Sequence, residues 1–304
     1  MNEKSKAHRG GQLRENVMQV VFLIAACISI LAVALICIYL FANGIPAIAE
    51  IGPFQFLLGT DWRPNADHYG IFPMILGSIY VTAGAIIVGV PLGLLAAIFM
   101  AKFCPAPLYK VLKPAVDLLA GIPSIVYGFF GLMVIVPLMQ KVFPNTSGKS
   151  ILTASILLGI MILPTIIGVS ESAIRAVPDS YYEGALALGA SHERSVFFVT
   201  VPAAKSGIMA GIILGVGRAI GETMAVIMIA GNQPRIPDSL LDGVRTLTGN
   251  IVTEMGYATG LHREALIATG VVLFVFILII NLLFSHHQAE GEQSVSDMAE
   301  NMNK

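Results

Sequence analysis

The chain has 304 residues, of which 56% are hydrophobic and only 12% are charged, and its mean hydropathy is +0.79. Because a soluble protein carries about twice that share of charged residues, the composition argues against a disordered chain, a nucleic-acid binder and an ordinary soluble enzyme. The formal net charge of -1 gives no overall field that would attract a charged partner, so electrostatic recognition must be local. The composition predicts an all-α protein that crosses the membrane several times.

Apolar stretches predict the membrane spans, since a helix needs roughly 20 mainly apolar residues to cross the hydrocarbon core. The first stretch is longer than the apolar region of a cleaved signal peptide, about 7–15 residues, so we expect it to remain as a span. A further stretch is interrupted only by Arg218 and Glu222. The six predicted spans are 17–41, 71–101, 118–140, 150–170, about 206–230 and 265–285.

These spans divide the chain into a tail over 1–16, a first helix with its outer loop over 17–70, a transmembrane core over 71–285 and a second tail over 286–304. The second tail is rich in Gln, Glu and Asn, which predicts disorder. Eleven Lys and Arg residues fall on the side of the two termini and six on the other side, with Arg218 left within a span. Because loops rich in Lys and Arg stay in the cytoplasm, we expect both termini there.

The third predicted span contains a break. Pro123 and two flanking glycines, Gly121 and Gly128, lie within it, and proline removes a helix hydrogen bond. Helices that break at membrane depth often line substrate paths, because their freed backbone groups need polar partners. Ser124 and Tyr127 could make such hydrogen bonds. A proline kink that binds no ligand fits the same pattern.

The loop after the fourth span contains a short predicted surface helix over 181–188. Gly189 follows it as a helix stop, and Ser191 could cap a second short helix that Pro202 ends. The small side chains on the first helix, at Gly184 and Ala185, would form a flat knob that fits a groove on another protein. The residues themselves support a docking hypothesis and no more.

Arg218 and Glu222 are the two charges left inside a span, where a charge usually faces a partner or a water-filled path. On a continuous helix a spacing of four places them on one face, where an ion pair can close. Glycines at 207, 211 and 215 would share that face, which lets another helix approach closely. The pair is either a buried structural salt bridge or a site where Arg218 meets an anion while Glu222 holds or competes for it.

The loop after the fourth span resembles the signature of permease subunits of bacterial ABC importers. That signature is Glu-Ala-Ala, three residues, Gly, nine residues, Ile, one residue and Leu-Pro. The matching positions are Glu183, Ala185, Gly189 and Pro202, and the small or conservative departures are Gly184, Val199 and Val201. The resemblance implies that Glu183, Gly184, Ala185 and Gly189 belong to a coupling helix that inserts into an ATPase subunit. The chain itself has no phosphate-binding loop for ATP, so hydrolysis is expected on a separate subunit.

Two further segments, 119–128 and 217–226, resemble phosphate importer permeases, and the Glu-Thr-Met-Ala-Val ending of the second resembles the PstC type. The resemblance implies a type I importer permease in the bacterial inner membrane, with six transmembrane helices. It also implies a PstA-type second permease, two ATP-binding subunits and an extracytoplasmic phosphate-binding protein. Arg218, Glu222, Thr223, Ser124 and Tyr127 are the expected substrate-path residues.

The leading hypothesis is therefore a permease subunit that gives inorganic phosphate an alternating-access path into the cytoplasm. A permease for molybdate or sulfate fits the coupling signature equally well, and a platform that senses phosphate and signals through its cytoplasmic loops is a second alternative. A membrane-embedded enzyme is disfavoured, because the spans contain no nucleophile with a base and no cluster of metal ligands. The three cysteines lie in or beside apolar stretches, which predicts packing residues rather than a metal site. No cofactor is expected.

Overall fold

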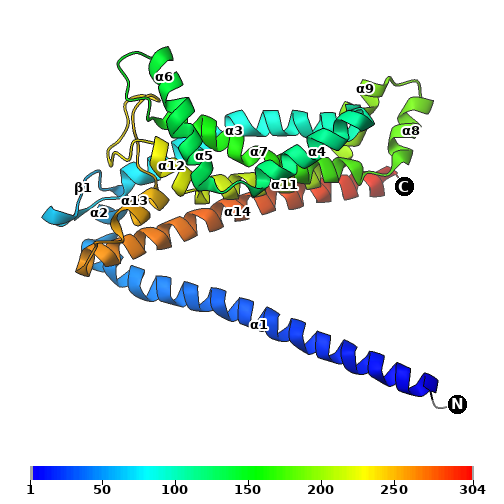
Figure 1. Ribbon diagram of the computed structural model, residues 1–304, viewed down its shortest axis with the longest axis horizontal. Helices are drawn as coiled ribbons and strands as arrows, with labels where there is room; N and C mark the ends of the chain where they lie inside the picture. Colours follow the sequence, from blue (N-terminus) through cyan, green and yellow to red (C-terminus); the bar gives the residue numbers. More distant parts are fainter. Residues whose placement is uncertain (1–2, 303–304) are drawn as a thin grey trace.

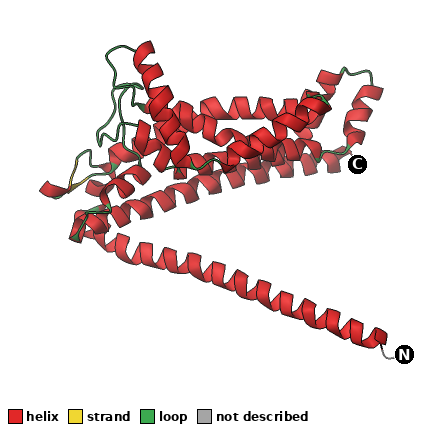
Figure 2. Cartoon of the chain, viewed as in Figure 1, coloured by secondary structure: helices red, strands yellow, loops and turns green. Residues whose placement is uncertain are grey.

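The structure is a computed structural model that describes the backbone of residues 3–302 and the side chains of residue 15 and residues 17–283. Helices make up most of this part of the chain (Figure 2). The strands β1 (Trp62–Arg63) and β2 (His68–Tyr69) pair antiparallel as a short hairpin around the 3₁₀ turn η1 (Pro64–Ala66). The prediction of an all-α chain is confirmed apart from this hairpin.

Five helical segments within the described residues are long and apolar enough to cross a membrane, and a pair of segments bent by 70° is a sixth candidate. The five lie in α1 (Glu3–Ile51), in α3 (Phe72–Ile98) with η2 (Phe99–Phe103), in α5 (Ser124–Phe130) with η3 (Gly131–Ile135) and α6 (Val136–Val142), in α7 (Ile151–Arg175) and in α14 (Gly260–Met302). The bent pair joins α9 (His192–Ser195), η4 (Val196–Thr200) and α10 (Val201–Ala203) to α11 (Lys205–Gly221).

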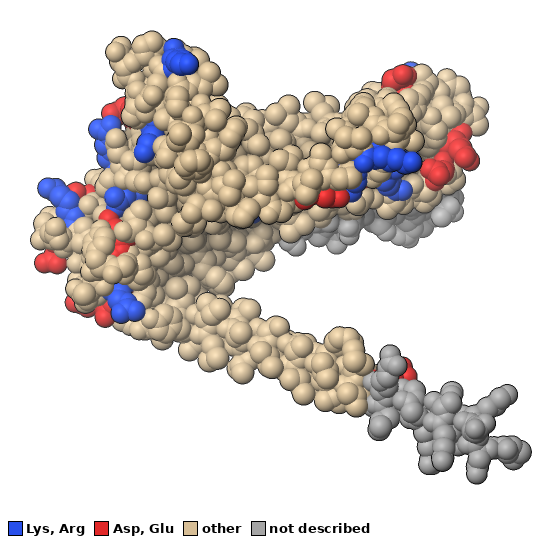
Figure 3. Space-filling view, in the orientation of Figure 1, with Lys and Arg blue, Asp and Glu red and all other residues tan. Residues whose placement is uncertain are grey.

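The shorter helices lie at the two ends of the helix bundle (Figure 1). One end, here called the α13 end, holds the hairpin together with α2 (Pro53–Leu58), α12 (Met224–Ile229) and α13 (Leu247–Glu254). The other end, the α8 end, holds α8 (Asp179–Ala187), α9 and the beginning of α4 (Ala106–Gly121). The first turn of α1 and the last turn of α14 both lie toward the α8 end, and α1 diverges from the bundle along most of its length. Charged side chains gather mainly at the two ends (Figure 3).

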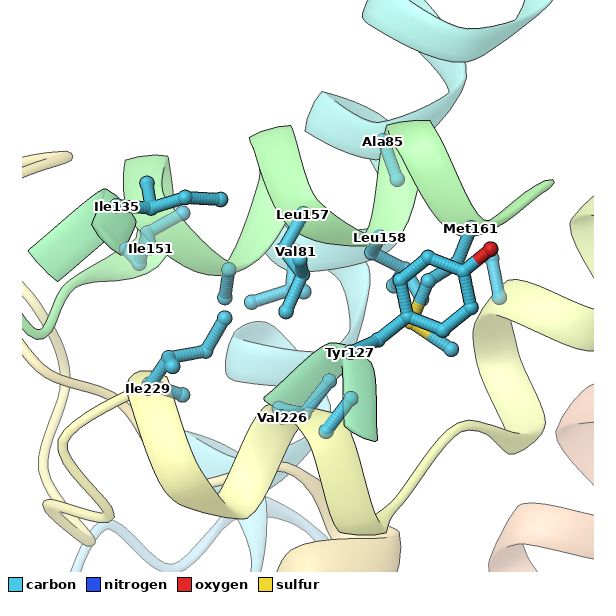
Figure 4. Packing of buried hydrophobic residues seen from close by; sticks show 14 of the residues in the cluster. Val81, Ala85, Tyr127, Ile135, Ile151, Leu157, Leu158, Met161, Val226 and Ile229 are labelled. Atoms are coloured by element: carbon cyan, nitrogen blue, oxygen red, sulfur yellow. The ribbon is translucent and has the colours of Figure 1, made fainter. Parts of the chain in front are cut away.

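Helix α7 is the centre of the bundle. Its buried side chains include Leu157, Leu158, Met161 and Ile162, which pack in one cluster with residues of α3, α5 and α12 (Figure 4). Close approach of α3 depends on glycine, because a Cβ added at Gly89 would lie 2.7 Å from the Ile162 Cγ1 atom. The apolar character of 150–170 therefore builds a packed core as well as a span.

Two of the predicted spans have different limits in the structure. The third begins at Ser124 rather than at 118, because the chain is extended at Ile122 and Pro123 and residues 118–121 belong to α4. The span predicted over 206–230 is broken, since α11 ends at Gly221 and α12 begins at Met224, with an extended backbone at Glu222. The break at Pro123 confirms the prediction from sequence, whereas the break at Glu222 was not predicted.

The loops and tails also differ from the sequence-based expectations. Helix α1 runs to Ile51, and α2 and the hairpin fill most of the loop predicted before residue 70. The backbone of α14 continues helically to Met302, beyond the point at which composition predicts a disordered tail over 286–304. That stretch contains helix formers such as Glu, Gln and Ala and has no proline. The side chains of 284–304 and of most of the tail over 1–16 lie outside the described residues.

Candidate functional site

Arg218 lies in the last turn of α11, and its side chain is half-buried. Among the side chains of residues 17–283, none forms a hydrogen bond or an ion pair with its guanidinium group. The glycine face of the same helix packs against α7, where a Cβ at Gly215 would lie 2.8 Å from Ile166 and one at Gly211 would lie 3.0 Å from the Ser170 hydroxyl. The predicted close contact between helices is confirmed. Arg218 lies at the end of this contact, where its guanidinium group could bind a ligand.

The ion pair with Glu222 is not formed, and the expectation that both residues share one helical face is wrong. The reason is local, because Glu222 follows the last residue of α11 and has φ -70° and ψ 130°, which is not helical. Its carboxylate instead accepts a hydrogen bond of 3.1 Å from the Ala225 backbone N–H in the first turn of α12. The neighbouring Thr223 hydroxyl donates to the Gly221 carbonyl at 3.2 Å. Glu222 and Thr223 therefore shape the break between the two helices.

The other break has a similar stabilising contact. Tyr127 is buried in α5, and its hydroxyl donates a 2.8 Å hydrogen bond to the Leu119 carbonyl on the α4 side of the break. Its ring extends toward Met161 of α7 (Figure 4). Ser124 is half-buried at the beginning of α5.

The two broken spans meet each other. A Cβ added at Gly128 of α5 would lie 2.9 Å from the Ala225 Cα atom and 2.8 Å from the Met228 sulfur of α12. Since α5 and α12 pack this closely, the structure brings the segment with Ser124 and Tyr127 beside the segment with Glu222 and Thr223. Four of the five expected substrate-path residues thus lie in or next to two segments that pack together, and Arg218 lies in the last turn of α11 before the second break.

The residues of the expected coupling helix lie in α8, at the opposite end of the bundle from α13. The helix spans Asp179–Ala187, close to the predicted 181–188, and Gly189 ends it with a φ of +84°, a backbone conformation that glycine adopts without strain. Glu183 and Gly184 are exposed, Ala185 is half-buried and Leu188 is 91% exposed. Ser191 caps α9 as predicted, accepting a hydrogen bond from the Arg194 N–H, although the helical segment continues through Pro202 to Ala203.

Sequence reasoning missed a buried carboxylate near the α8 end. Glu171, in the last turns of α7, is 1% exposed and accepts hydrogen bonds from three side chains. These are Tyr109 at 2.6 Å, Lys113 at 3.1 Å and Arg175 at 2.8 Å. A signal was present, because Tyr109 with Lys113 and Glu171 with Arg175 are each spaced by four residues, which places each pair on one helix face.

A second missed carboxylate, Glu254, is buried at the α13 end. It accepts hydrogen bonds from the Trp62 indole at 2.9 Å, from His262 at 2.8 Å and from Arg245. Burial alone would raise the pKa of Glu254, but the hydrogen bonds from Trp62, His262 and Arg245 outweigh it and hold the pKa below the ordinary value of 4.5. The cluster joins the hairpin, the loop before α13 and the beginning of α14, and no local spacing in the sequence could reveal it.

Helices that break inside candidate spans, with a half-buried arginine beside the breaks, are features of membrane transport proteins. Residues 89–289 match the family described as binding-protein-dependent transport system inner membrane component. The chain belongs to this family, and it is the permease component of an ABC transporter rather than a catalytic subunit. Membership implies ATPase subunits and a binding protein as partners.

Curated relatives agree over most of the chain. It is 38% identical over 287 residues to the probable ABC transporter permease protein YqgH of Bacillus subtilis, covering 91% of this chain and 93% of the relative. It is 36% identical to the phosphate transport system permease protein PstC of Mesorhizobium japonicum, covering 84% of each chain. The resemblance predicted from the sequence motifs is confirmed.

Solved structures show the same fold at low sequence identity. A chain of a bacterial alginate ABC transporter, in complex with an alginate-bound periplasmic protein, matches with a TM-score of 0.61 at 16% identity, covering 90% of this chain and 95% of that chain. A chain of the MetNI methionine ABC transporter matches with a TM-score of 0.59 at 19% identity, covering 73% and 95%. The fold is therefore that of ABC importer permeases.

Proposed function

We propose that this chain is a permease subunit of an ATP-driven importer of inorganic phosphate. The observation that carries the proposal is the Arg218 guanidinium, which is half-buried and has no partner among the described side chains, beside the junction of two broken helices. An arginine in such a place offers a fork of N–H donors that suits an oxyanion. The relatives named as phosphate permeases favour phosphate among the oxyanions.

One arginine does not balance the charge of phosphate, which carries more than one negative charge near neutral pH. A second permease, of the PstA type, would supply the remaining positive charge across the shared path. Ser124 would add a hydroxyl donor. Tyr127 and Thr223, whose hydroxyl protons go to the Leu119 and Gly221 carbonyls, would hold the two breaks, as Glu222 does through its bond to Ala225. Hydrogen bonds donated by the arginine and by the Ser124 hydroxyl to the oxygens of the anion would then position it without a covalent step.

The same proposal orients the chain. The α8 end would face the cytoplasm, where α8 meets an ATP-binding subunit, and the α13 end would face the extracytoplasmic binding protein. Because the beginning of α1 and the end of α14 lie toward the α8 end, both termini would be cytoplasmic. The charge bias of the loops supports this orientation.

Uptake of radiolabelled phosphate by cells that depend on this transporter tests the assignment. Arg218→Ala is expected to lower uptake about 10–100-fold, since it removes charged hydrogen bonds to the anion. Arg218→Lys is the matched control for charge and should retain part of the uptake, because lysine keeps the charge without the planar fork. Normal uptake by an Arg218→Ala variant that assembles at wild-type level would contradict the role of Arg218.

Competition distinguishes phosphate from other oxyanions. Unlabelled phosphate should abolish uptake of the label, whereas sulfate and molybdate at the same concentration should leave it unchanged. If molybdate or sulfate is the transported ion, wild-type cells will accumulate that ion in a manner that depends on Arg218, and the phosphate assignment fails.

A further inference from the structure

Helix α4 is attached to the bundle in an unusual way. It is 16 residues long, yet none of its residues is buried, and apolar side chains such as Val111 and Leu118 are exposed. Within this chain, a helix with so little buried surface gains little from packing against its neighbours. Its position must therefore depend on a few specific contacts.

The contacts that attach its first half are those of Glu171. Tyr109 and Lys113 reach from α4 to the buried carboxylate on α7, with donor–acceptor distances of 2.6 Å and 3.1 Å. Hydrogen bonds to an ionised group are stronger than neutral ones. Since Glu171 is 1% exposed, its charge needs these donors.

Arg175 adds a third element to the same cluster. Its Nε donates to Glu171 at 2.8 Å, its Nη2 donates to the Met100 carbonyl in η2 at 2.7 Å, and its guanidinium lies 4.4 Å from the centre of the Tyr109 ring. The cluster thus joins α4, the last turn of α7 and the segment after α3. The cluster therefore links four helical segments of the α8 end, since α8 follows Arg175 after only three residues.

The other end of α4 reaches the substrate path. There the chain breaks at Ile122 and Pro123, and the Tyr127 hydroxyl donates back to Leu119 in the last turns of α4 at 2.8 Å. A displacement of α4 is therefore passed to α5, which packs against α12 beside Arg218. Helix α4 therefore connects the last turn of α7, next to α8, with the broken span that contains α5.

We propose that Glu171 is a positioning residue that couples α8 to the substrate path, with α4 as the moving link between them. Movement of α8 shifts the last turn of α7, Glu171 carries α4 with it through Tyr109 and Lys113, and α4 displaces the Tyr127 end of α5. The inference rests on the proposed role of α8 as the site at which the ATP-binding subunit acts.

The test removes the α4 side of the cluster and leaves Glu171 paired. The double variant Tyr109→Phe/Lys113→Met retains the ion pair between Glu171 and Arg175, so the buried carboxylate is not left without a counter-charge. Asp117→Asn is the matched control, because Asp117 lies on the same helix and pairs with Lys113 at 3.6 Å but is exposed and does not contact Glu171. Both are purified as assembled complexes and reconstituted in vesicles.

ATP hydrolysis and phosphate uptake are measured on the same vesicles. We expect the double variant to hydrolyse ATP within about twofold of wild type while uptake per ATP falls about tenfold, within the usual range for a lost coupling between sites. The Asp117→Asn complex should match wild type in both. Unchanged uptake per ATP in the double variant overturns the proposal, as does a proportional loss of both activities, which a purely structural role would produce.

Spin labels give a second readout that needs no transported ion. With the three native cysteines replaced, labels at Val111→Cys and Ser172→Cys report the distance between α4 and α7. We expect a narrow distribution that is the same with and without trapped ATP, and a broad one in the double variant. A distance that already changes with ATP in the otherwise wild-type complex would overturn the proposal. If wild-type vesicles import no phosphate, the proposed substrate fails, while this distance still tests the coupling.

Discussion

Glu171 and Glu254 are both buried carboxylates that accept bonds from three side chains, yet their donors lie in different surroundings. At the α13 end, Trp62 and its hairpin partner Tyr69 are already packed in an apolar cluster with α13 and α14. At the α8 end, Tyr109 and Lys113 belong to a helix with no buried residue. Hydrogen bonds to a buried carboxylate therefore stabilise an already packed region at the α13 end, and at the α8 end they hold a helix that has no buried residue of its own.

The largest expected effect is on stability at the α13 end. Glu254→Ala would leave Arg245, whose side chain is only 15% exposed, without its counter-charge, and we expect the free energy of unfolding to fall by about 3 kcal/mol. Trp62, the only tryptophan in the chain, donates to Glu254, so its fluorescence reports thermal unfolding of this region directly. Asp61→Asn, in an exposed pair of the same hairpin, is the control and should leave the midpoint unchanged. An unchanged midpoint for Glu254→Ala would remove the contrast between the two ends.

Acid should weaken the same region. Because the pKa of Glu254 is lower in the folded protein than its ordinary value of 4.5, ionised Glu254 stabilises the fold above that value, and this contribution is lost as the pH falls through the folded pKa. Thermal midpoints measured by circular dichroism from pH 7 to pH 3 should fall below about pH 4.5. Trp62→Phe removes one donor and brings the folded pKa closer to the ordinary value, so its loss of stability should be smaller and should be complete at a higher pH. Coinciding pH profiles would show that the indole does not lower the pKa.

The smallest effect on stability is expected for helix α4. Tyr109→Phe removes one hydrogen bond to Glu171 and leaves those of Lys113 and Arg175, so the free energy of unfolding should change by only about 1 kcal/mol. The measurement is the same thermal midpoint. A loss as large as that of Glu254→Ala would mean that α4 is part of the stable core, contrary to its lack of buried residues.

The spans were predictable because long apolar stretches have few alternatives, and the break at Pro123 was predictable because proline removes a helix hydrogen bond. The break at Glu222 was not, since Arg218 and Glu222 have the spacing of one helical turn and only the structure shows that α11 ends between them. The short helix α8 followed from its glycine stop and small residues.

The two carboxylate clusters were beyond the reach of local patterns. Glu171 is 62 and 58 residues from Tyr109 and Lys113, and Glu254 is 192 residues from Trp62. Such contacts depend on how the helices pack, which periodicity within one helix does not determine. Charge content singled out Arg218 and Glu222 because they lie inside a predicted span. Glu171 was not singled out, because the fourth span was predicted to end at residue 170, one residue before it.

The glycine face of α11 has a mechanical consequence. Where helices interlock through large side chains, a shift along their axes must lift each side chain out of its hole. Along Gly207, Gly211 and Gly215 the interlocking is one-sided: α11 has no side chain at these positions, and α7 residues such as Ala173 and Ile166 occupy the space that a Cβ would take. A larger residue at any of these three positions would push α11 away from α7, so the glycines set how closely the helix that ends beside Arg218 lies against the core.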